Sequence, residues 1–383
     1  MKKLIAILVM LALATGAAFA QISGDLNMGV SLLHGYAEGN DTDIKMGGNG
    51  AGFGHENGSK WSITFGEGKG IGRVVYRLHD ASFWGWFQWS PIEQLRIRFG
   101  WDRDGYWGAA QISGWGFTGI AKDLITARMY NGGFYMRTFQ GLDEATFYPG
   151  IGDGNRQALG ISILPVDGLQ INLAIPSLNQ SKEISLQLAD FHANIVYNIE
   201  DVGTARLSFV GRGGLGKDQE KVSTPGQVYG SFYLTAIDAL RLDLGVMFVL
   251  PWKNTADQDS GGRLSAGLGL TTSSGPFSLK VRAGALIGGK SAGADLDTII
   301  AVGVLPSYKF SAFTFYFHAG LGMMMPKEGD NVVEWFISPY LQVPTGGFNF
   351  WVGLLIEKER KGNGPNYNEN IVWGIPIGFN VSY

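Results

Sequence analysis

Few residues in this chain have the types and spacing that catalysis requires. The segment Gly289-Lys-Ser291-Ala-Gly293 matches the G-x-S-x-G pattern of a serine nucleophile, which needs a strand before it and a helix after it. This copy lies in a polar stretch of a chain with 58 glycines, so we interpret it as a chance match. The five histidines are dispersed without paired spacing, and there is no cysteine. We therefore expect no catalytic residue, no metal site, no cofactor and no enzymatic activity.

Many of the charged residues alternate with apolar ones. In 95–99, 206–209 and 240–246, large apolar side chains occupy every second position and charged or small ones lie between them. Successive side chains of a strand point to opposite faces, so each of these segments predicts a strand with one apolar and one polar face. The candidate polar-face residues that would line a lumen and set its selectivity are Arg96, Arg98, Asp102, Arg206, Arg212, Arg241, Asp243, Arg263, Lys280, Arg282 and Glu357.

The elements that must position these residues are β-hairpins. Alternating runs at 159–164 and 169–175, at 228–234 and 240–250, and at 263–270 and 277–283 are joined by short turns. Further turns are expected at 90–94, 200–203, 306–309 and 344–347. A helix would scatter side chains two apart around its circumference, so the spacing excludes it. Pro339 and Pro376 interrupt strand runs, and each should lose a hydrogen bond of the ladder.

Counting the connections predicts the fold class. Seven short turns, a first strand near 26–33 and a last strand at 371–383 imply about 16 strands, with 14 or 18 as alternatives. Segments 61–65 and 74–78 would form one more hairpin or belong to the first loop. The prediction is an all-β, transmembrane, antiparallel up-and-down barrel with short periplasmic turns and long outer loops. The longest loop, 103–156, is expected either to narrow the pore or to cap it.

The last eleven residues carry a family resemblance. Ile375, Ile377, Phe379, Val381 and Tyr383 alternate with Gly, Pro, Asn and Ser up to an aromatic carboxyl terminus. This pattern resembles the C-terminal strand of bacterial outer-membrane β-barrel proteins. The resemblance implies that the barrel-assembly machinery of the envelope recognises these five residues, and that the chain is porin-like in layout.

The amino-terminal residues predict the compartment. Lys2 and Lys3 precede an apolar run at 4–14 and the sequence Ala18-Phe19-Ala20, which is typical of a secretory signal peptide. We expect residues 1–20 to be removed and 21–383 to form a single barrel domain in the outer membrane. No later run reaches the length of a membrane-spanning helix.

These patterns favour a channel. A barrel of this size is too wide for side chains to fill, so we expect passive diffusion of small hydrophilic solutes, with mild anion selectivity as a hypothesis. The alternatives are a transporter for hydrophobic compounds and a surface barrel or adhesin without a channel. The expected partners are outer-membrane lipid, the assembly machinery and the solutes. The apolar outer faces would allow a homo-oligomer, and the net charge of −3 gives no sign of nucleic-acid binding.

Overall fold

The computed structural model describes residues 21–38, 41–46, 60–77, 82–101, 157–177, 191–210, 213–215, 222–224, 226–253, 258–291, 293–361 and 368–382. Within these ranges the chain consists of strands and turns. None of the described segments is a helix with the length and apolar character to cross a membrane. The strands of the first half are β1 (Gln21–Glu38), β2 (Asp41–Met46), β3 (Lys60–Glu67), β4 (Gly70–Arg77), β5 (Ser82–Ile92), β6 (Leu95–Trp101), β7 (Gln157–Val166), β8 (Leu169–Ser177), β9 (His192–Ile199), β10 (Gly203–Val210), β11 (Gly213–Leu215), β12 (Val222–Thr224) and β13 (Gln227–Leu234). Those of the second half are β14 (Leu240–Val249), β15 (Trp252–Lys253), β16 (Asp259–Ser260), β17 (Leu264–Ser274), β18 (Phe277–Ile287), β19 (Lys290–Ser291), β20 (Ala294–Asp295), β21 (Thr298–Lys309), β22 (Thr314–Met325), β23 (Val332–Thr345), β24 (Phe348–Gly353), β25 (Leu355–Lys361) and β26 (Asn368–Ser382).

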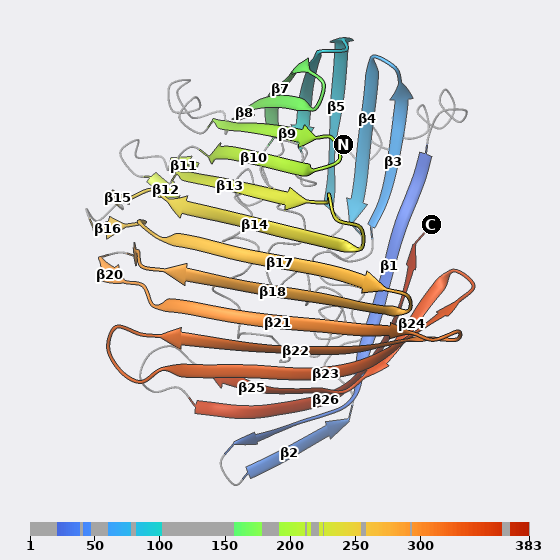
Figure 1. Cartoon of the computed structure of the whole chain (residues 1–383), viewed down its shortest axis with the longest axis vertical. Helices are drawn as coiled ribbons and strands as arrows, with labels where there is room; N and C mark the ends of the chain where they lie inside the picture. The colour runs from blue at the N-terminus through green and yellow to red at the C-terminus, as the bar shows by residue number, and fades with distance from the viewer. Residues whose placement is uncertain are drawn as a thin grey trace.

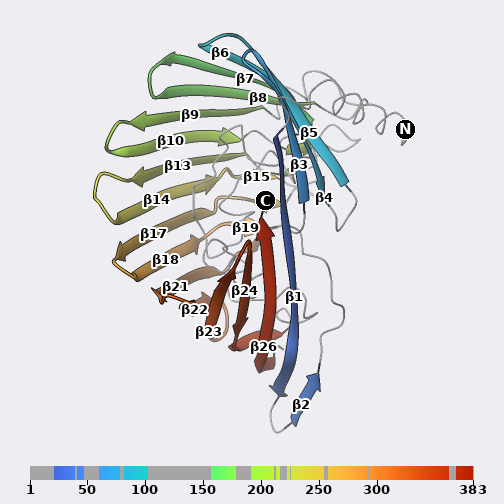
Figure 2. The same cartoon turned by 90° about the vertical axis from the view of Figure 1, so that its right-hand side faces the viewer.

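Twenty of these strands form one strongly curved sheet (Figures 1 and 2). Neighbours in the sequence pair antiparallel, as in β7–β8, β13–β14 and β17–β18. The tight turn Asp167–Gly168 illustrates why: Gly168 has φ 78°, which glycine adopts without steric cost. Its carbonyl accepts a 2.8 Å hydrogen bond from the Asn198 amide of the next hairpin. Short turns of this kind lie at one end of the strands and the longer connections at the other.

The first strand joins the two ends of the sheet. β1 pairs with β26 from Asp25↔Ser382 to Ala37↔Ile371. On its other side it pairs with β3 over five residues only, from Gln21↔Thr64 to Asp25↔Lys60. The wall is therefore barrel-like without being a fully closed cylinder. Figure 2 shows β1 between β26 and the β3–β4 hairpin.

Three of the prolines in the described strands lie where the ladder is irregular. Pro91 and Pro165 lie at register shifts between Trp89 and Ile92 and between Ile163 and Val166. Pro376 borders a shift on β1 between Ser31 and His34. β-Bulges of this kind leave one residue unpaired, so a missing N–H costs little there.

Pro339 has a different solution, at a break in the facing strand. β24 and β25 both pair with β23 and are interrupted at Leu354. There the Leu354 amide donates to the Pro339 carbonyl at 2.9 Å, and the Ser338 hydroxyl donates to the Leu354 carbonyl at 2.8 Å. The Ser338 hydroxyl thus supplies a hydrogen-bond donor to the Leu354 carbonyl at the position where Pro339 has no N–H.

The structure confirms an all-β, antiparallel fold and changes its details. The count of about 16 strands is not confirmed, because β3 and β4 form a complete hairpin of the sheet and β2 adds a short strand on β1. The turn expected at 306–309 is wrong. β21 continues to Lys309 and the turn is closed by Phe310, whose amide donates to the Phe313 carbonyl. Pro306 is accommodated within β21, opposite Leu279 of β18.

Candidate functional site

The sheet has two chemically different faces. On β6, Arg98 is 4 % exposed while its neighbour Phe99 is 50 % exposed. On β14 the same contrast separates buried Met247 from exposed Val246. Side chains diverge on the convex side of a curved sheet and crowd together on the concave side. We therefore assign the buried face to the inside and call the two sides the inner face and the outer face.

The outer face is apolar along continuous rows of paired residues. One row crosses nine strands, from β7 to β21, without a charged or hydrogen-bonding side chain: Ile163, Ile171, Ile195, Leu207, Gly230, Val246, Ala266, Ala285 and Ile300. Most of its large members are exposed. A soluble protein rarely exposes so large an apolar surface, whereas a surface in contact with lipid requires one.

The next row, one residue away along each strand, lies on the inner face and begins polar. It contains Arg96, Ser162, Asn172, Asn194 and Ser208, and then continues through Tyr229, Met247, Ser265 and Leu286. The polar part lies on β6–β10, and the part on β13–β18 mixes Ser265 with large side chains. Along this row the inner face is therefore polar on β6–β10 and more apolar on β13–β18.

Hydrogen bonds run along the polar part in one direction. Gln170 Nε2 donates to Asn172 Oδ1 at 2.7 Å, Asn172 Nδ2 donates to Asn194 Oδ1 at 2.6 Å, and Asn194 Nδ2 donates to Ser208 Oγ at 3.1 Å. Asn172 and Asn194 are 2 % and 3 % exposed, so their amides have these bonds in place of water. We call Gln170, Asn172, Asn194 and Ser208 the amide ladder.

A basic and aromatic group lies beside this ladder on β4–β6. The guanidinium of Arg98 lies over the Trp86 ring and donates through Nη2 to Gln88 Oε1 at 3.2 Å. Trp86 pairs across the sheet with Arg73, whose Nη2 donates to Ser62 Oγ at 3.2 Å. Sequence reasoning missed Arg73 because the adjoining segment 74–78 was assigned either to a hairpin or to a loop, and it did not single out Trp86 or Gln88. The available signal was that Arg73 and Arg77 fall on one face of a strand while Val74 and Tyr76 fall on the other.

The predicted lumen residues are distributed over the sheet and do not form one cluster. Arg96 is half-buried on β6, and Arg206 is half-buried on β10, which also carries Ser208 of the amide ladder. Lys280 belongs to a row with Arg241 and Thr271. Arg241 is exposed near a tight turn, where Nη1 donates to the Thr235 carbonyl at 3.3 Å.

Other predicted positions are described only in part. Arg263 lies at the long-loop end, where Nη2 donates to the Asp297 carbonyl at 3.1 Å. Burial lowers the pKa of Arg263 below its ordinary value, and the nearby charge of Asp297 offsets only part of this shift. The backbones of Asp243 and Arg282 lie in the sheet on either side of Gly269, and Glu357 pairs with Phe336. Their side chains lie outside the described residues, as do Asp102, Arg212 and loop 103–156.

The predicted assembly signal lies in β26, which pairs with β1. Ile375 and Ile377 are half-buried. Phe379 and Val381 are described by their backbone, and Tyr383 lies outside the described residues.

The G-x-S-x-G motif lacks the strand-turn-helix arrangement that a serine nucleophile needs, and the described histidine does not belong to a catalytic cluster. Lys290 and Ser291 form the two-residue strand β19, which turns directly into β20 and not into a helix. His318 is buried against Phe336, with ring centroids 4.7 Å apart. Among the described residues, no three His, Asp or Glu side chains come together as metal ligands.

Comparison with known proteins identifies the architecture. No protein-family model matches the chain, and no curated protein matches its sequence. Solved structures do match. Pseudomonas aeruginosa OpdQ has a TM-score of 0.53 at 9 % identity, covering 95 % of this chain and 98 % of that one. An anion-selective porin from Comamonas acidovorans has a TM-score of 0.51 at 11 % identity, with 95 % and 99 % covered. P. aeruginosa OccK2, solved in complex with glucuronate, has a TM-score of 0.51 at 10 % identity, with 95 % and 98 % covered.

These identities carry information on fold and not on substrate. The match nevertheless spans nearly the whole of each chain, and it agrees with the apolar outer face and polar inner face. The chain has the fold of the outer-membrane porins.

Proposed function

We propose that this protein is an outer-membrane channel through which small hydrophilic solutes diffuse passively, with a mild preference for anions. The observation that carries the proposal is the segregation of the two faces. An uninterrupted apolar row faces outward on β7–β21, and the row beside it carries Arg96, Asn172 and Asn194 inward. Such a surface suits lipid outside and water or solute inside.

The proposed preference for anions rests on the arginines of the inner face. Arg73 lies on β4, and Arg96 and Arg98 lie on β6, so the three arginines belong to the two strands that flank β5. A guanidinium remains charged throughout the accessible pH range. Fixed positive charge along a pore lowers the barrier for anions and raises it for cations. The similarity to the Comamonas porin is one of fold, so selectivity has to be tested on this chain.

The proposal includes the route to the membrane. Residues 1–20 would act as a removable signal peptide, and the alternating residues of β26 would be read by the barrel-assembly machinery. Fractionation of expressing cells and amino-terminal sequencing of the mature protein test both points. A mature protein that begins at Gln21 in the outer-membrane fraction is the expected result.

Planar-bilayer recording on the refolded chain 21–383 tests the channel. We expect discrete conductance steps, and uptake of small sugars when the same protein is placed in swelling liposomes. Absence of both from protein with intact β-structure would favour a display barrel over a channel. Under a salt gradient, the sign of the reversal potential should indicate anion preference, and the opposite sign would reject it.

A further inference from the structure

Three long-side connections form one structured unit at the end of the sheet opposite the tight turns. Their described parts are 250–253 and 258–263 between β14 and β17, 288–291 and 293–297 between β18 and β21, and 326–331 between β22 and β23. The first two contain the small hairpins β15–β16 and β19–β20. Figure 1 shows β15, β16 and β20 projecting beyond the long strands at this end. We call these three segments the rim loops.

Backbone hydrogen bonds hold the rim loops together. Gly261 and Lys290 exchange two bonds, N to O at 2.9 Å and 2.8 Å. The Gly293 amide donates to the Asp259 carbonyl at 2.8 Å, which ties β20 to β16. The third loop is attached by Lys327, whose Nζ lies 2.6 Å from Asp295 Oδ2. Because the bonds between the first two rim loops involve main-chain atoms, variants of the Asp259 and Lys290 side chains should leave that scaffold in place.

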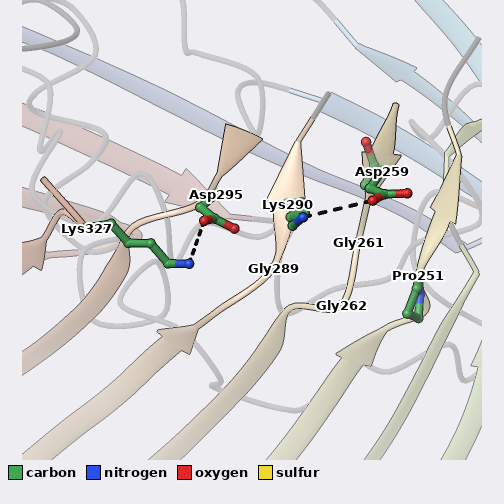
Figure 3. Close-up of a pocket in the computed structure, with 9 residues that line it drawn as sticks. Pro251, Asp259, Gly261, Gly262, Gly289, Lys290, Asp295 and Lys327 are labelled. Carbon is green, nitrogen blue, oxygen red and sulfur yellow. Dashed lines mark hydrogen bonds and ion pairs between the residues drawn. The ribbon is translucent and has the colours of Figure 1, made fainter. Parts of the chain in front are cut away.

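The rim loops line an open, solvent-exposed cavity of about 600 Å³. Its lining includes Asp259, Lys290, Asp295 and Lys327 together with glycine backbone at 261, 262 and 289. Figure 3 shows the four charged side chains in the order Lys327, Asp295, Lys290, Asp259, so positive and negative charges alternate. The volume falls within the range of small-molecule sites, and the four charges sum to zero.

The two ion pairs are not equivalent. Lys327 and Asp295 form a short hydrogen-bonded pair. Lys290 Nζ lies 4.0 Å from Asp259 Oδ2, which is longer than a hydrogen bond. Lys290 also lies opposite Asp295 across β19–β20, and its charge contributes to lowering the pKa of that carboxyl group. An ammonium and a carboxylate of a ligand could therefore insert between Lys290 and Asp259 while the shorter pair stays closed.

We propose that this cavity binds small zwitterions that carry one ammonium and one carboxylate, namely α-amino acids or short peptides. The ligand carboxylate pairs with Lys290 Nζ and the ligand ammonium pairs with Asp259. A simple anion or cation leaves one of the two protein charges without a new partner, so it gains less. The site lies at the long-loop end, which in the proposed orientation is the outer mouth of the channel.

Binding can be tested without any assumption about conduction, so failure of this proposal and failure of the channel proposal are distinguishable. Saturation-transfer NMR on the full mature chain in detergent would measure the affinity for dialanine, alanine, acetate and methylammonium. We expect dialanine and alanine to bind more tightly than either singly charged probe, and their ratio shows whether the cavity prefers a peptide. Equal affinity for all four probes would overturn the proposal.

Two charge-removing variants locate the site. Lys290→Gln and Asp259→Asn should each weaken zwitterion binding by roughly two- to fivefold, the range expected of exposed ion pairs. Lys309→Gln, at the opposite end of β21, removes the same charge outside the cavity and should leave the affinity unchanged. If either cavity variant binds dialanine as tightly as the wild type, the four charges are solvated ion pairs and the proposal fails.

Discussion

The guanidinium carbon of Arg98 lies 3.7 Å from the centroid of the Trp86 ring, between neighbouring strands β6 and β5. The ring holds the charge against the inner face while Gln88 Oε1 accepts one of its N–H groups at 3.2 Å. A cation–π contact of this kind contributes about 0.5–2 kcal/mol. The pair therefore fixes a permanent positive charge at a defined position on the inner face.

Arg98→Gln should reduce the preference of the channel for anions. A unit charge about 8 Å from a passing ion in water changes the energy of that ion by about 0.5 kcal/mol, or roughly twofold in permeability. Reversal potentials under a salt gradient measure the ratio directly. Lys69→Gln, in the exposed turn before β4, is the control and should change it less. Identical ratios for the wild type and Arg98→Gln would mean that permeating ions do not pass near Arg98.

Leu244→Arg should destabilise the protein in lipid. Leu244 is exposed on the outer face and pairs with Phe232 and Leu268. An arginine at mid-depth on a lipid-facing strand costs about 2–4 kcal/mol. Urea unfolding in lipid vesicles would measure the change, with Leu244→Met as the neutral control. A variant as stable as the control would show that this face does not contact hydrocarbon.

Asn194→Ala should break the amide ladder in two. Asn172 Nδ2 would lose its acceptor and Ser208 Oγ its donor, and unsatisfied buried groups cost about 1–3 kcal/mol. Asn198→Ala, which removes an exposed acceptor of the Thr204 hydroxyl, should cost less than about 0.5 kcal/mol. The same unfolding assay applies. Equal losses for the two variants would indicate that the ladder contributes no more than a surface bond.

The Lys327–Asp295 pair predicts a pH dependence of the rim loops. The hydrogen bond from Lys327 holds the pKa of the Asp295 carboxyl group below its ordinary value. A lowered folded-state pKa means that the pairing is complete at neutral pH and is lost only as the pH falls through that lowered value. Carboxyl NMR titration should give an Asp295 midpoint below that of a free aspartate, and Lys327→Gln should raise it. An unchanged midpoint in the variant would contradict the assignment.

The strands and their faces could be predicted because period-two alternation depends only on local sequence. The expected runs at 159–164, 169–175 and 277–283 lie within β7, β8 and β18. Arg98 was predicted to lie on the inner face for the same reason; in the structure it is buried and its neighbour Phe99 is exposed. The β3–β4 hairpin was harder to predict from the sequence. A segment with few alternating residues shows the same pattern whether it forms a strand of the sheet or part of a loop.

Other features depend on partners distant in the sequence. Nothing local indicates that Ser338 donates to the Leu354 carbonyl, or that Pro339 faces the interruption between β24 and β25. The turn expected at Pro306 was wrong because proline suggests a turn locally, whereas its place in β21 follows from the pairing with β18. The rim-loop cavity likewise joins residues from three connections, so no single segment predicted it.

The pairing of β1 with β26 has a consequence for the order of folding. Asp25 pairs with Ser382 in the β1–β26 ladder, so the described strand pairing of greatest sequence separation joins the earliest described strand to the last. Closing a longer stretch of chain costs more entropy, and folds rich in distant contacts form slowly. We expect the central hairpins to acquire protection from hydrogen exchange first and the junction of the two terminal strands to acquire it last.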